Sequence, residues 1–429
     1  MELMNAKGTK DFLPEEKILR DEITQKIKDI FERYGYNPLE TPILERYDVV
    51  TAKFGAGENS DAMNEIFKLQ DQGGRELGLR FELTFPLARV IGMNPGLKMP
   101  FKRYQFGEVF RDGPIKLGRM RQFWQCDVDI IGVKSVAADA ELLALARDVF
   151  QALNLDVTLE VNTRKILSAI LSSVNITTEK QQAVLIALDK IKKLTKEELT
   201  KELKNLNLNK EQVQFLLEIM ALQGTNEEKL KRLQIILKGD ESLLELQEFF
   251  KYLKEFDIEV IFSPSLVRGL SYYTGPIYEA YLKNSSITSS VAGGGRWDAM
   301  IGSYLESDKI FPATGISFGL EPITEALKMQ KSIKKSVVQV YVVPIKTEEE
   351  AITCVSALRK EGINADIDLV GRGISKNLEY ANTYGIPFVC ILGKEELSKK
   401  KYKLKNMESG EEELLSFEAL TKKLIKKEQ

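Results

Sequence analysis

The first long apolar pattern in the chain lies between Pro14 and Gly35. Apolar side chains recur there with the spacing of one helix face, at Leu19, Ile23, Ile27, Ile30, Phe31 and Tyr34. A proline just before such a pattern and a glycine just after it are typical helix start and stop signals. The pattern therefore predicts an amphipathic helix over residues 15–34.

From Pro38 to Gly132 the texture changes to short segments, often alternating between apolar and polar residues, with Gly and Pro between them. Alternation with a period of two is typical of strands that bury one face. We expect two such strands at residues 101–111 and 119–131. A helical pattern follows at residues 137–153, and then a short strand at Asp156–Val161. Together these segments predict an antiparallel sheet with flanking helices.

Residues 163–257 are rich in Lys, Glu and Leu and predict a helical insertion. Capping-box patterns at Thr195–Glu198 and Thr225–Glu228 mark two of its helix starts. The charges are of mixed sign, which favours a solvated face over contact with nucleic acid. Strand texture resumes at Ile258.

After a polar linker, KMQKSIKKS, a separate module begins near Val337. Its pattern is strand, helix, strand, helix, strand, over residues 337–345, 347–361, 364–369, 374–384 and 387–393. This alternation predicts a compact α/β unit of domain size. The fold class is therefore α/β, with one domain at residues 1–327, carrying the helical insertion, and a second at residues 337–429.

The composition of the chain mainly excludes classes of protein. Hydrophobic residues make up 43% of the 429 residues and charged residues 29%, as in globular proteins, and the net charge of −2 provides no overall basic field for nucleic acid. No apolar run approaches the roughly eighteen residues of a membrane helix, and the N-terminus lacks the apolar core of a signal peptide. Three widely spaced cysteines, Cys126, Cys354 and Cys390, indicate a reducing compartment and hence the cytoplasm.

The chain contains no histidine. This excludes protein histidine as a general base or metal ligand, and with it triad hydrolases and most zinc enzymes. Any chemistry must rely on Arg, Lys, carboxylates, amides and Tyr.

The stretch FRDGPIKLGRMRQFWQCDVDI, residues 110–130, places a cationic loop before an unusual strand. In that strand Gln125, Asp127 and Asp129 share one face, because successive side chains alternate. The loop and its ends carry three arginines, Arg111, Arg119 and Arg121. A solvated edge strand would explain the polar face alone, but not the crowding of arginines on the same hairpin.

Two further segments carry polar residues of the same kind. LRFELTFPLAR offers Glu82 and Thr84, two apart on an expected strand face. Arg268 and Arg296 form a second arginine cluster, the latter directly after Gly293–Gly295, a run that alone indicates only a turn or bulge.

Arginines that face carboxylates suit a substrate with both an anionic group and a donor-rich group. The sequence has no GxxxxGK[ST] motif, so ATP, if bound, is not held in a P-loop; GRGISK at 371–376 is interpreted as a turn before a helix.

These segments resemble the class II aminoacyl-tRNA synthetases, and specifically the histidyl-tRNA synthetase family, over nearly the whole chain. The family's first motif, which builds a dimer interface, resembles GTKDFLPEE and YGYNPLETPILE. The second motif resembles FGEVFRDGPIKLGRMRQFWQCDVDIIG. Two signatures found only in the histidine enzyme resemble LVRGLSYYTGPIYEA and AGGGRWDAMI. The C-terminal module is similar to the family's anticodon-binding domain.

The resemblance implies a role for each polar group. Arg111 is expected to contact the ATP α-phosphate and the substrate carboxylate, with Gln125 beside that carboxylate and Arg268 stabilising charge at phosphorus. Asp129 would hold the imidazole N–H. The full expected histidine-binding set is Glu82, Leu83, Thr84, Arg111, Gln125, Asp129, Arg268, Tyr272 and Tyr273. The expected ATP-binding set is Arg111, Arg119, Arg121 and Arg296.

The resemblance also implies the partners: L-histidine, tRNA(His), ATP with its Mg²⁺, and a second copy of the chain, with no tightly bound protein metal and no membrane. The sequence departs from the family pattern at three positions. Ser271 replaces an aspartate, Trp297 replaces a tyrosine that borders the histidine pocket, and Pro322 replaces the third-motif arginine that stacks on adenine.

The expected function is ATP-dependent attachment of L-histidine to tRNA(His) through a histidyl-adenylate. The alternative is a non-catalytic paralogue, a histidine-binding regulatory subunit of ATP phosphoribosyltransferase. The C-terminal module favours the ligase, because that regulatory family generally lacks it. A different class IIa synthetase is disfavoured by the two histidine-specific signatures.

Overall fold

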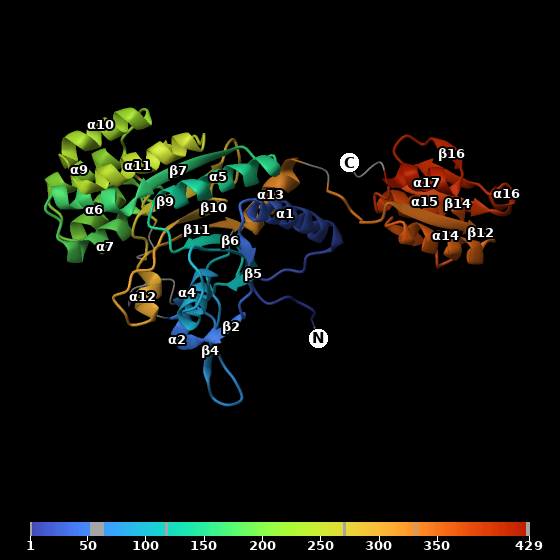
Figure 1. Ribbon diagram of the computed structural model, residues 1–429, viewed down its shortest axis with the longest axis horizontal. Helices are drawn as coiled ribbons and strands as arrows, with labels where there is room; N and C mark the ends of the chain where they lie inside the picture. Colours follow the sequence, from blue (N-terminus) through green and yellow to red (C-terminus); the bar gives the residue numbers. More distant parts are fainter. Residues whose placement is uncertain (1, 52–63, 116–118, 269–271, 331–332, 426–429) are drawn as a thin grey trace. The chain divides into compact units, whose positions relative to one another are not determined.

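The computed structural model describes residues 2–51, 64–115, 119–268, 272–330 and 333–425 (Figure 1). The chain divides into two compact units. The first is mainly Ile23–Gln330, together with Met1–Lys10, and the second is mainly Lys331–Gln429, together with Asp11–Glu22.

The first unit is built on an eight-stranded sheet. Its strands, in spatial order, are β1 (Asn37–Pro38), β5 (Phe101–Phe110), β6 (Gln122–Ile131), β11 (Ala313–Gly319), β10 (Ala292–Arg296), β9 (Pro276–Leu282), β7 (Val157–Thr163) and β8 (Ile261–Phe262). Neighbours pair antiparallel except at the two edges, where β1 with β5 and β7 with β8 are parallel. The predicted antiparallel sheet is confirmed.

One face of this sheet is covered by helices α1 (Pro14–Arg33) and α5 (Ala137–Ala152). The Phe31 ring of α1 stacks on Phe106 of β5 at 5.7 Å, and Phe150 of α5 contacts Phe318 of β11 at 5.6 Å. We call this the helix face. Both helices agree with the apolar patterns that predicted them.

Beside the sheet, a smaller layer supports the segment that contains Glu82. It consists of α2 (Tyr47–Val50), α4 (Thr84–Met93), α12 (Met300–Tyr304) and a three-stranded sheet of β2 (Leu44–Arg46), β4 (Glu76–Leu79) and β3 (Lys68–Gln70). Helix α4 was not predicted, and the expectation that Glu82 and Thr84 share a strand face is wrong. Thr84 begins the helix, whose first turn tolerates Pro86 because the missing N–H has no partner there anyway.

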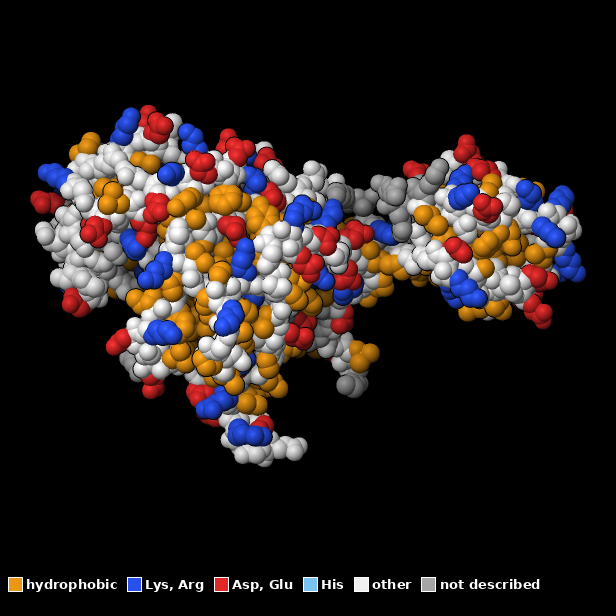
Figure 2. Space-filling view, in the orientation of Figure 1, with side chains coloured by type: hydrophobic (Ala, Val, Ile, Leu, Met, Phe, Trp, Pro, Cys, Tyr) orange, Lys and Arg blue, Asp and Glu red, His pale blue; other side chains and the backbone are white. Residues whose placement is uncertain are grey.

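The predicted insertion consists of six helices that gather next to β7 and β9 in Figure 1. They are α6 (Arg164–Ser173), α7 (Thr178–Leu188), α8 (Lys196–Asn205), α9 (Lys210–Met220), α10 (Asn226–Leu237) and α11 (Glu241–Glu255). The capping boxes at Thr195 and Thr225 are confirmed, and a third at Asn209 was not predicted. Figure 2 shows acidic and basic side chains interspersed on the visible face of these helices, as a solvated surface would have.

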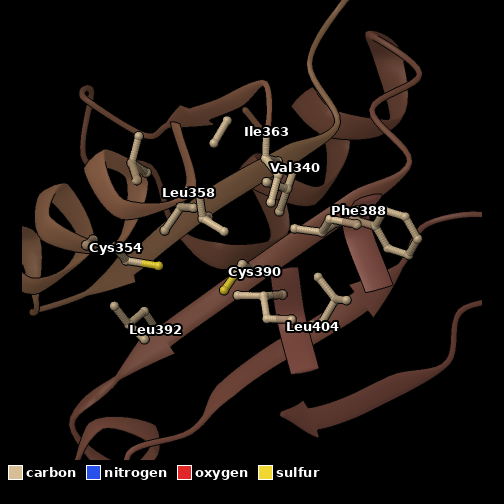
Figure 3. Packing of buried hydrophobic residues seen from close by; sticks show 14 residues of the cluster. Val340, Cys354, Leu358, Ile363, Phe388, Cys390, Leu392 and Leu404 are labelled. Carbon is tan, nitrogen blue, oxygen red and sulfur yellow. The ribbon is translucent and has the colours of Figure 1, made fainter. Parts of the chain in front are cut away.

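The second unit has a five-stranded sheet and a core of its own. Helix α13 (Leu320–Gln330) ends the first unit. The second unit then contains β12 (Val340–Ile345), α14 (Glu348–Lys360), β13 (Ala365–Ile367), α15 (Ile374–Thr383), β14 (Phe388–Gly393), α16 (Lys394–Ser398), β15 (Tyr402–Asn406), β16 (Glu412–Leu415) and α17 (Phe417–Ile425). The strand order is β13-β12-β14-β15-β16. The core includes Cys354 and Cys390, both buried thiols, packed among aliphatic side chains (Figure 3). The predicted α/β module is confirmed through β14; the elements after it were not predicted.

Within the part of the chain that the structure describes, no helix combines the length and apolar character needed to cross a bilayer.

Candidate active site

The polar face of β6 lies in the middle of the large sheet, opposite the helix face. In register with Gln125, Asp127 and Asp129 are, on β5, Gly107, Gln105 and Arg103, and, on β11, Gly319, Ser317 and Gly315. Cross-strand partners point to the same side of a sheet. The three predicted residues therefore face the same side as a row of polar and glycine positions, which we call the site face.

Glycines form the floor of the site face. A Cβ atom on Gly293 would lie 2.3 Å from Nη1 of Arg268, and one on Gly315 would lie 2.0 Å from Oδ1 of Asp129. A Cβ atom on Gly295 would lie 2.8 Å from the Tyr273 ring. Gly293–Gly295 is thus part of strand β10 and not a turn or bulge. The absent side chains leave room for a guanidinium, a carboxylate and a ring directly above the sheet.

Three buried carboxylates converge on this face. Glu82, Asp127 and Asp129 are 6%, 4% and 3% exposed. Burial raises the pKa of Glu82 to about 7, opposed by Arg111, and raises the pKa of Asp129 to about 7, opposed by Arg103. The pKa of Asp127 is raised for the same reason. A cationic or N–H-bearing ligand would favour the ionised forms.

Several buried polar atoms of the site have no hydrogen-bond partner among the described residues. They are Oε1 of Glu82, Oε1 of Gln105, Oε1 of Gln125, Oδ1 of Asp127, Oδ2 of Asp129, and Nε and Nη1 of Arg103. In folded proteins about nine in ten or more buried polar groups are paired. Such a concentration of unpaired atoms on one face is the property of a site that receives a polar ligand.

Two arginines lie over the carboxylates. Arg111 is held between aromatic rings, with Cζ 4.2 Å from the Phe81 centroid and 5.1 Å from that of Phe123, and its Nε donates to the Phe81 carbonyl at 3.2 Å. Arg268 has Nε 3.8 Å from Oε1 of Glu279 and lies 5.5 Å from the Tyr273 centroid. The charges of both arginines act on Glu82, so the cations and carboxylates form one electrostatic site.

Arg268 also has a left-handed backbone, with φ of 48°. A non-glycine residue in this region is strained, by about 1 kcal/mol or more, and such residues concentrate at functional sites. The residues that follow it, including the departure at Ser271, lie outside the described part of the chain.

The two other arginines of the hairpin lie at its surface. Nη2 of Arg119 is 3.4 Å from Oε1 of Glu65, and Nη1 of Arg121 is 2.8 Å from Oδ1 of Asp112. Each therefore has an acidic partner that an anionic ligand would have to displace.

Leu83 and Thr84 occupy the turn into helix α4. The Leu83 side chain has no exposed surface, and its carbonyl accepts a hydrogen bond from Nη2 of Arg103 at 3.3 Å. Thr84 is partly exposed at the start of the helix, two residues after Glu82. Only Glu82 and Thr84 of this segment offer polar side chains to a ligand.

Tyr272 and Tyr273 pack against each other, with ring centroids 4.6 Å apart. Tyr272 also packs against an apolar cluster that contains Trp297, itself 2% exposed. The departure at Trp297 therefore supports the tyrosine pair from within the core.

Arg296 does not lie beside Arg268, as the expected second arginine cluster required. It is 2% exposed and points to the helix face, where Nη2 lies 2.5 Å from Oδ2 of Asp139 on α5. Its other donors reach the Val133 and Ser135 carbonyls at 2.9 and 3.0 Å and Oδ1 of Asp298 at 3.3 Å. Its donors are engaged on the opposite face from Arg268, so the two arginines do not form one cluster.

Pro322 lies in the first turn of α13, directly after β11. It is buried, and a Cβ atom on Gly319 would lie 2.9 Å from its ring. The neighbouring Glu321 accepts from the Trp124 backbone N–H at 3.1 Å. The position is therefore filled by packing and brings no charge to a nucleotide.

Sequence reasoning missed Arg103, Gln105 and Ser317. Ser317 accepts a hydrogen bond from Nε2 of Gln125 at 2.9 Å, and Arg103 pairs with Asp129. A signal was available for two of them: in FKRYQFGEVF, Arg103 and Gln105 alternate with apolar residues just as the acids do in the next strand.

Comparison with known proteins assigns the chain to a family. The family model described as histidyl-tRNA synthetase matches residues 8–323, and the model described as anticodon binding domain matches residues 339–427. Histidine–tRNA ligase 1 of Bacillus cereus is 42% identical over 429 residues, covering 99% of this chain and 100% of that protein.

Solved structures agree. Histidyl-tRNA synthetase from Nostoc sp. PCC 7120 matches with a TM-score of 0.87 at 28% identity and full coverage of both chains. An ATP phosphoribosyltransferase regulatory subunit/histidyl-tRNA synthetase from Bacillus halodurans matches with a TM-score of 0.76 at 22% identity, over 91% of this chain and 98% of that one, and shows the fold alone. The chain belongs to the histidyl-tRNA synthetase family.

Proposed function

We propose that the chain activates L-histidine with ATP and transfers it to tRNA(His). The observation that carries this proposal is the site face, where unpaired carboxylate and amide oxygens lie near two half-buried arginines, Arg111 and Arg268. A zwitterionic amino acid with a ring N–H supplies the hydrogen-bond donors for the unpaired oxygens. Its carboxylate and a nucleoside triphosphate supply the anions for the arginines.

On the amino-acid side, Glu82 and Thr84 bind the α-amino group, and Asp129 accepts the imidazole N–H. Tyr272 and Tyr273 line the ring pocket. The buried Leu83 side chain fixes the turn that carries Glu82 and Thr84. Selectivity follows from desolvation: a substrate without ring nitrogens would leave Asp129 buried and unpaired.

On the nucleotide side, Arg111 contacts the α-phosphate and the substrate carboxylate, and Arg268 stabilises the charge that develops at phosphorus. Gln125 lies beside the reacting carboxylate. Arg119 and Arg121 reach the outer phosphates after exchanging their acidic partners for ATP, which brings Mg²⁺ with it. We leave Arg296 out of this set because its donors are used on the helix face.

No general base is needed, since the histidine carboxylate is already an anion. The carboxylate oxygen attacks the α-phosphorus, pyrophosphate leaves, and the enzyme contributes positioning and charge stabilisation. The glycine floor and the aromatic rings beside Arg111 serve this purpose, because they fix where the guanidinium groups lie.

The remaining assignments follow from the same family. Residues 1–327 form the catalytic domain with its insertion at about 163–257, and residues 337–429 form the anticodon-binding domain. The chain acts as a homodimer in the cytoplasm. The regulatory-subunit alternative is disfavoured by the match of residues 339–427 to an anticodon-binding domain.

The test is histidine-dependent exchange of pyrophosphate into ATP, with the other amino acids as controls. Exchange with histidine alone is the expected result and would mean that Pro322 is tolerated. Absence of exchange, together with calorimetric binding of histidine, would instead favour the regulatory paralogue.

A further inference from the structure

Arg103 is a completely buried arginine in the centre of the site face. It is 0% exposed and lies on β5, in register with Asp129 on β6. Its Nη2 is 2.7 Å from Oδ2 of Asp129 and 3.3 Å from the Leu83 carbonyl. The contact with Asp129 is an ion pair and not a hydrogen bond, because Oδ2 has no hydrogen-bond partner among the described residues.

Two donor atoms of Arg103 have no hydrogen-bond acceptor among the described residues. Its Nε and Nη1 have no acceptor within the described residues, although Oε1 of Gln105 and Oδ1 of Asp127, in the adjacent register pair, also lack partners. Burying an unpaired polar group costs on the order of 1–3 kcal/mol. An arginine placed for stability alone would have its donors engaged, so a role in the site better explains its presence.

Arg103 is the cation that opposes protonation of Asp129. The titratable groups whose charges act on Asp129 are Arg103 from β5, Asp127 from its own strand and Glu82 from the turn before α4. From β11 the neighbour is a glycine. Two of these groups are carboxyls, so Arg103 alone among them supplies positive charge.

We propose that Arg103 is a positioning residue that determines specificity: it keeps Asp129 ionised and in place, with its hydrogen-bonding capacity left for the ring N–H of the substrate. This inference rests on the proposed function, in which that substrate is histidine. Arg103 acts through Asp129 and does not itself contact the ligand.

The role has a measurable signature. Without Arg103, Asp129 would hold its proton at neutral pH, because burial and two neighbouring carboxyls all favour the neutral form. An opposite charge at this distance shifts a carboxyl pKa by about 1–3 units. The loss should therefore appear in the Michaelis constant for histidine and in its pH dependence, and much less in the Michaelis constant for ATP.

The experiment compares Arg103→Met and Arg103→Lys with the matched control Arg296→Met. Arg296 also forms a buried pair with an aspartate, but on the helix face of the same sheet. Pyrophosphate exchange is measured from pH 6 to pH 9, with calorimetric binding of histidine on the same samples.

For Arg103→Met we expect the midpoint of the pH profile to move up by about 1.5 units and the KM for histidine at pH 7.5 to rise about tenfold, because the ionised fraction of Asp129 falls by that factor. Arg103→Lys should restore most of the loss. Arg296→Met should destabilise the fold but leave the midpoint in place. An unshifted midpoint in Arg103→Met, or an equal shift in Arg296→Met, overturns the inference.

If Arg103→Met does not fold, the substitution is made in the Asp129→Asn background instead, where the double variant has no buried charge at this pair. A residue that acts only through Asp129 should change the KM for histidine less than about threefold relative to Asp129→Asn alone. A larger change would overturn the inference. A wild-type chain that binds histidine without exchange would overturn the ligase function and leave the calorimetric test of Arg103 intact; one that neither binds nor activates histidine would overturn both.

Discussion

The large sheet carries a buried arginine–aspartate pair on each face, and the two pairs differ in what surrounds them. On the helix face, Arg296 and Asp139 are joined at 2.5 Å, and Asp139 also accepts from the Thr314 hydroxyl at 2.6 Å. On the site face, Arg103 and Asp129 are as deeply buried but keep unpaired donors and acceptors.

Whether the polar atoms of a pair have hydrogen-bond partners distinguishes a structural pair from a functional one better than burial or charge does. Both aspartates have a raised pKa, about 6 for Asp139 and about 7 for Asp129, and burial is the main cause in each. A perturbed pKa alone would mark both as functional. Only the Arg103–Asp129 pair, which keeps donors and acceptors without partners, is arranged to bind a ligand.

The largest expected effect is on stability, from Arg296→Met. Removing one partner of a buried pair costs about 3–5 kcal/mol, because the remaining charge stays unpaired. Urea unfolding should show this loss, while the Michaelis constants of the folded fraction stay near those of the wild type. A raised KM for ATP with unchanged stability would return Arg296 to the nucleotide site.

Asp129→Asn should act mainly on the kinetics. We expect kcat/KM for histidine to fall by about 10²–10³, equivalent to about 3–4 kcal/mol, because a neutral amide is a weaker acceptor for the ring N–H than a carboxylate. Stability should fall as well, because the Arg103 guanidinium stays buried without its counter-charge, so the kinetics are measured on the folded fraction. Asp139→Asn is the control and should lose stability without a comparable change in histidine kinetics. A loss of activity in both variants that only follows their unfolding would remove the distinction between the two faces.

The contrast also explains which parts of the molecule could be read from sequence. The long helices and the strands around Asp129 were predictable, because their apolar periodicity is a local property. The turn at Glu82 was not, since the helix that begins at Thr84 is fixed by packing against a cluster that includes Trp297 and Met300, far away in the chain. The last elements of the second unit have weaker patterns and were missed.

For the site, chemistry was predictable and geometry was not. The acids of β6 could be placed on one face from alternation alone. The position of Arg296 could not, because the same argument gives it a face but does not say which face binds substrate. That depends on Asp139, whose place on α5 becomes relevant only when the helix packs on the sheet.

A smaller effect is expected from Glu82→Gln, and its sign depends on pH. Burial raises the pKa of Glu82 to about 7, whereas a glutamate in an unfolded chain titrates near about 4.3. The stability that this group contributes is therefore fully present below about pH 4 and is lost as pH rises through about 7. The stability of Glu82→Gln relative to the wild type should therefore increase by about 2–3 kcal/mol between pH 5 and pH 8, a gain accompanied by weaker histidine binding. Denaturant titrations at the two pH values give the comparison, and a difference that shrinks with rising pH would contradict the assignment.

The smallest effects come from two hydroxyls on strand β11 that point to opposite faces. Thr314 donates to Asp139 and Ser317 accepts from Gln125, so each supports the polar group of its own face. Thr314→Val should lower the free energy of unfolding by about 1–2 kcal/mol with little kinetic change, because the hydroxyl that bonds both Asp139 and Tyr278 is lost. Ser317→Ala should lower kcat/KM for histidine about five- to tenfold, because the Gln125 amide loses its anchor, with a change in stability within about 0.5 kcal/mol. Each substitution removes one hydroxyl from the same strand, so disruption of the strand would affect both variants alike. It could not explain a kinetic loss in Thr314→Val together with a loss of stability alone in Ser317→Ala. That outcome would mean that the site lies on the face that α5 covers.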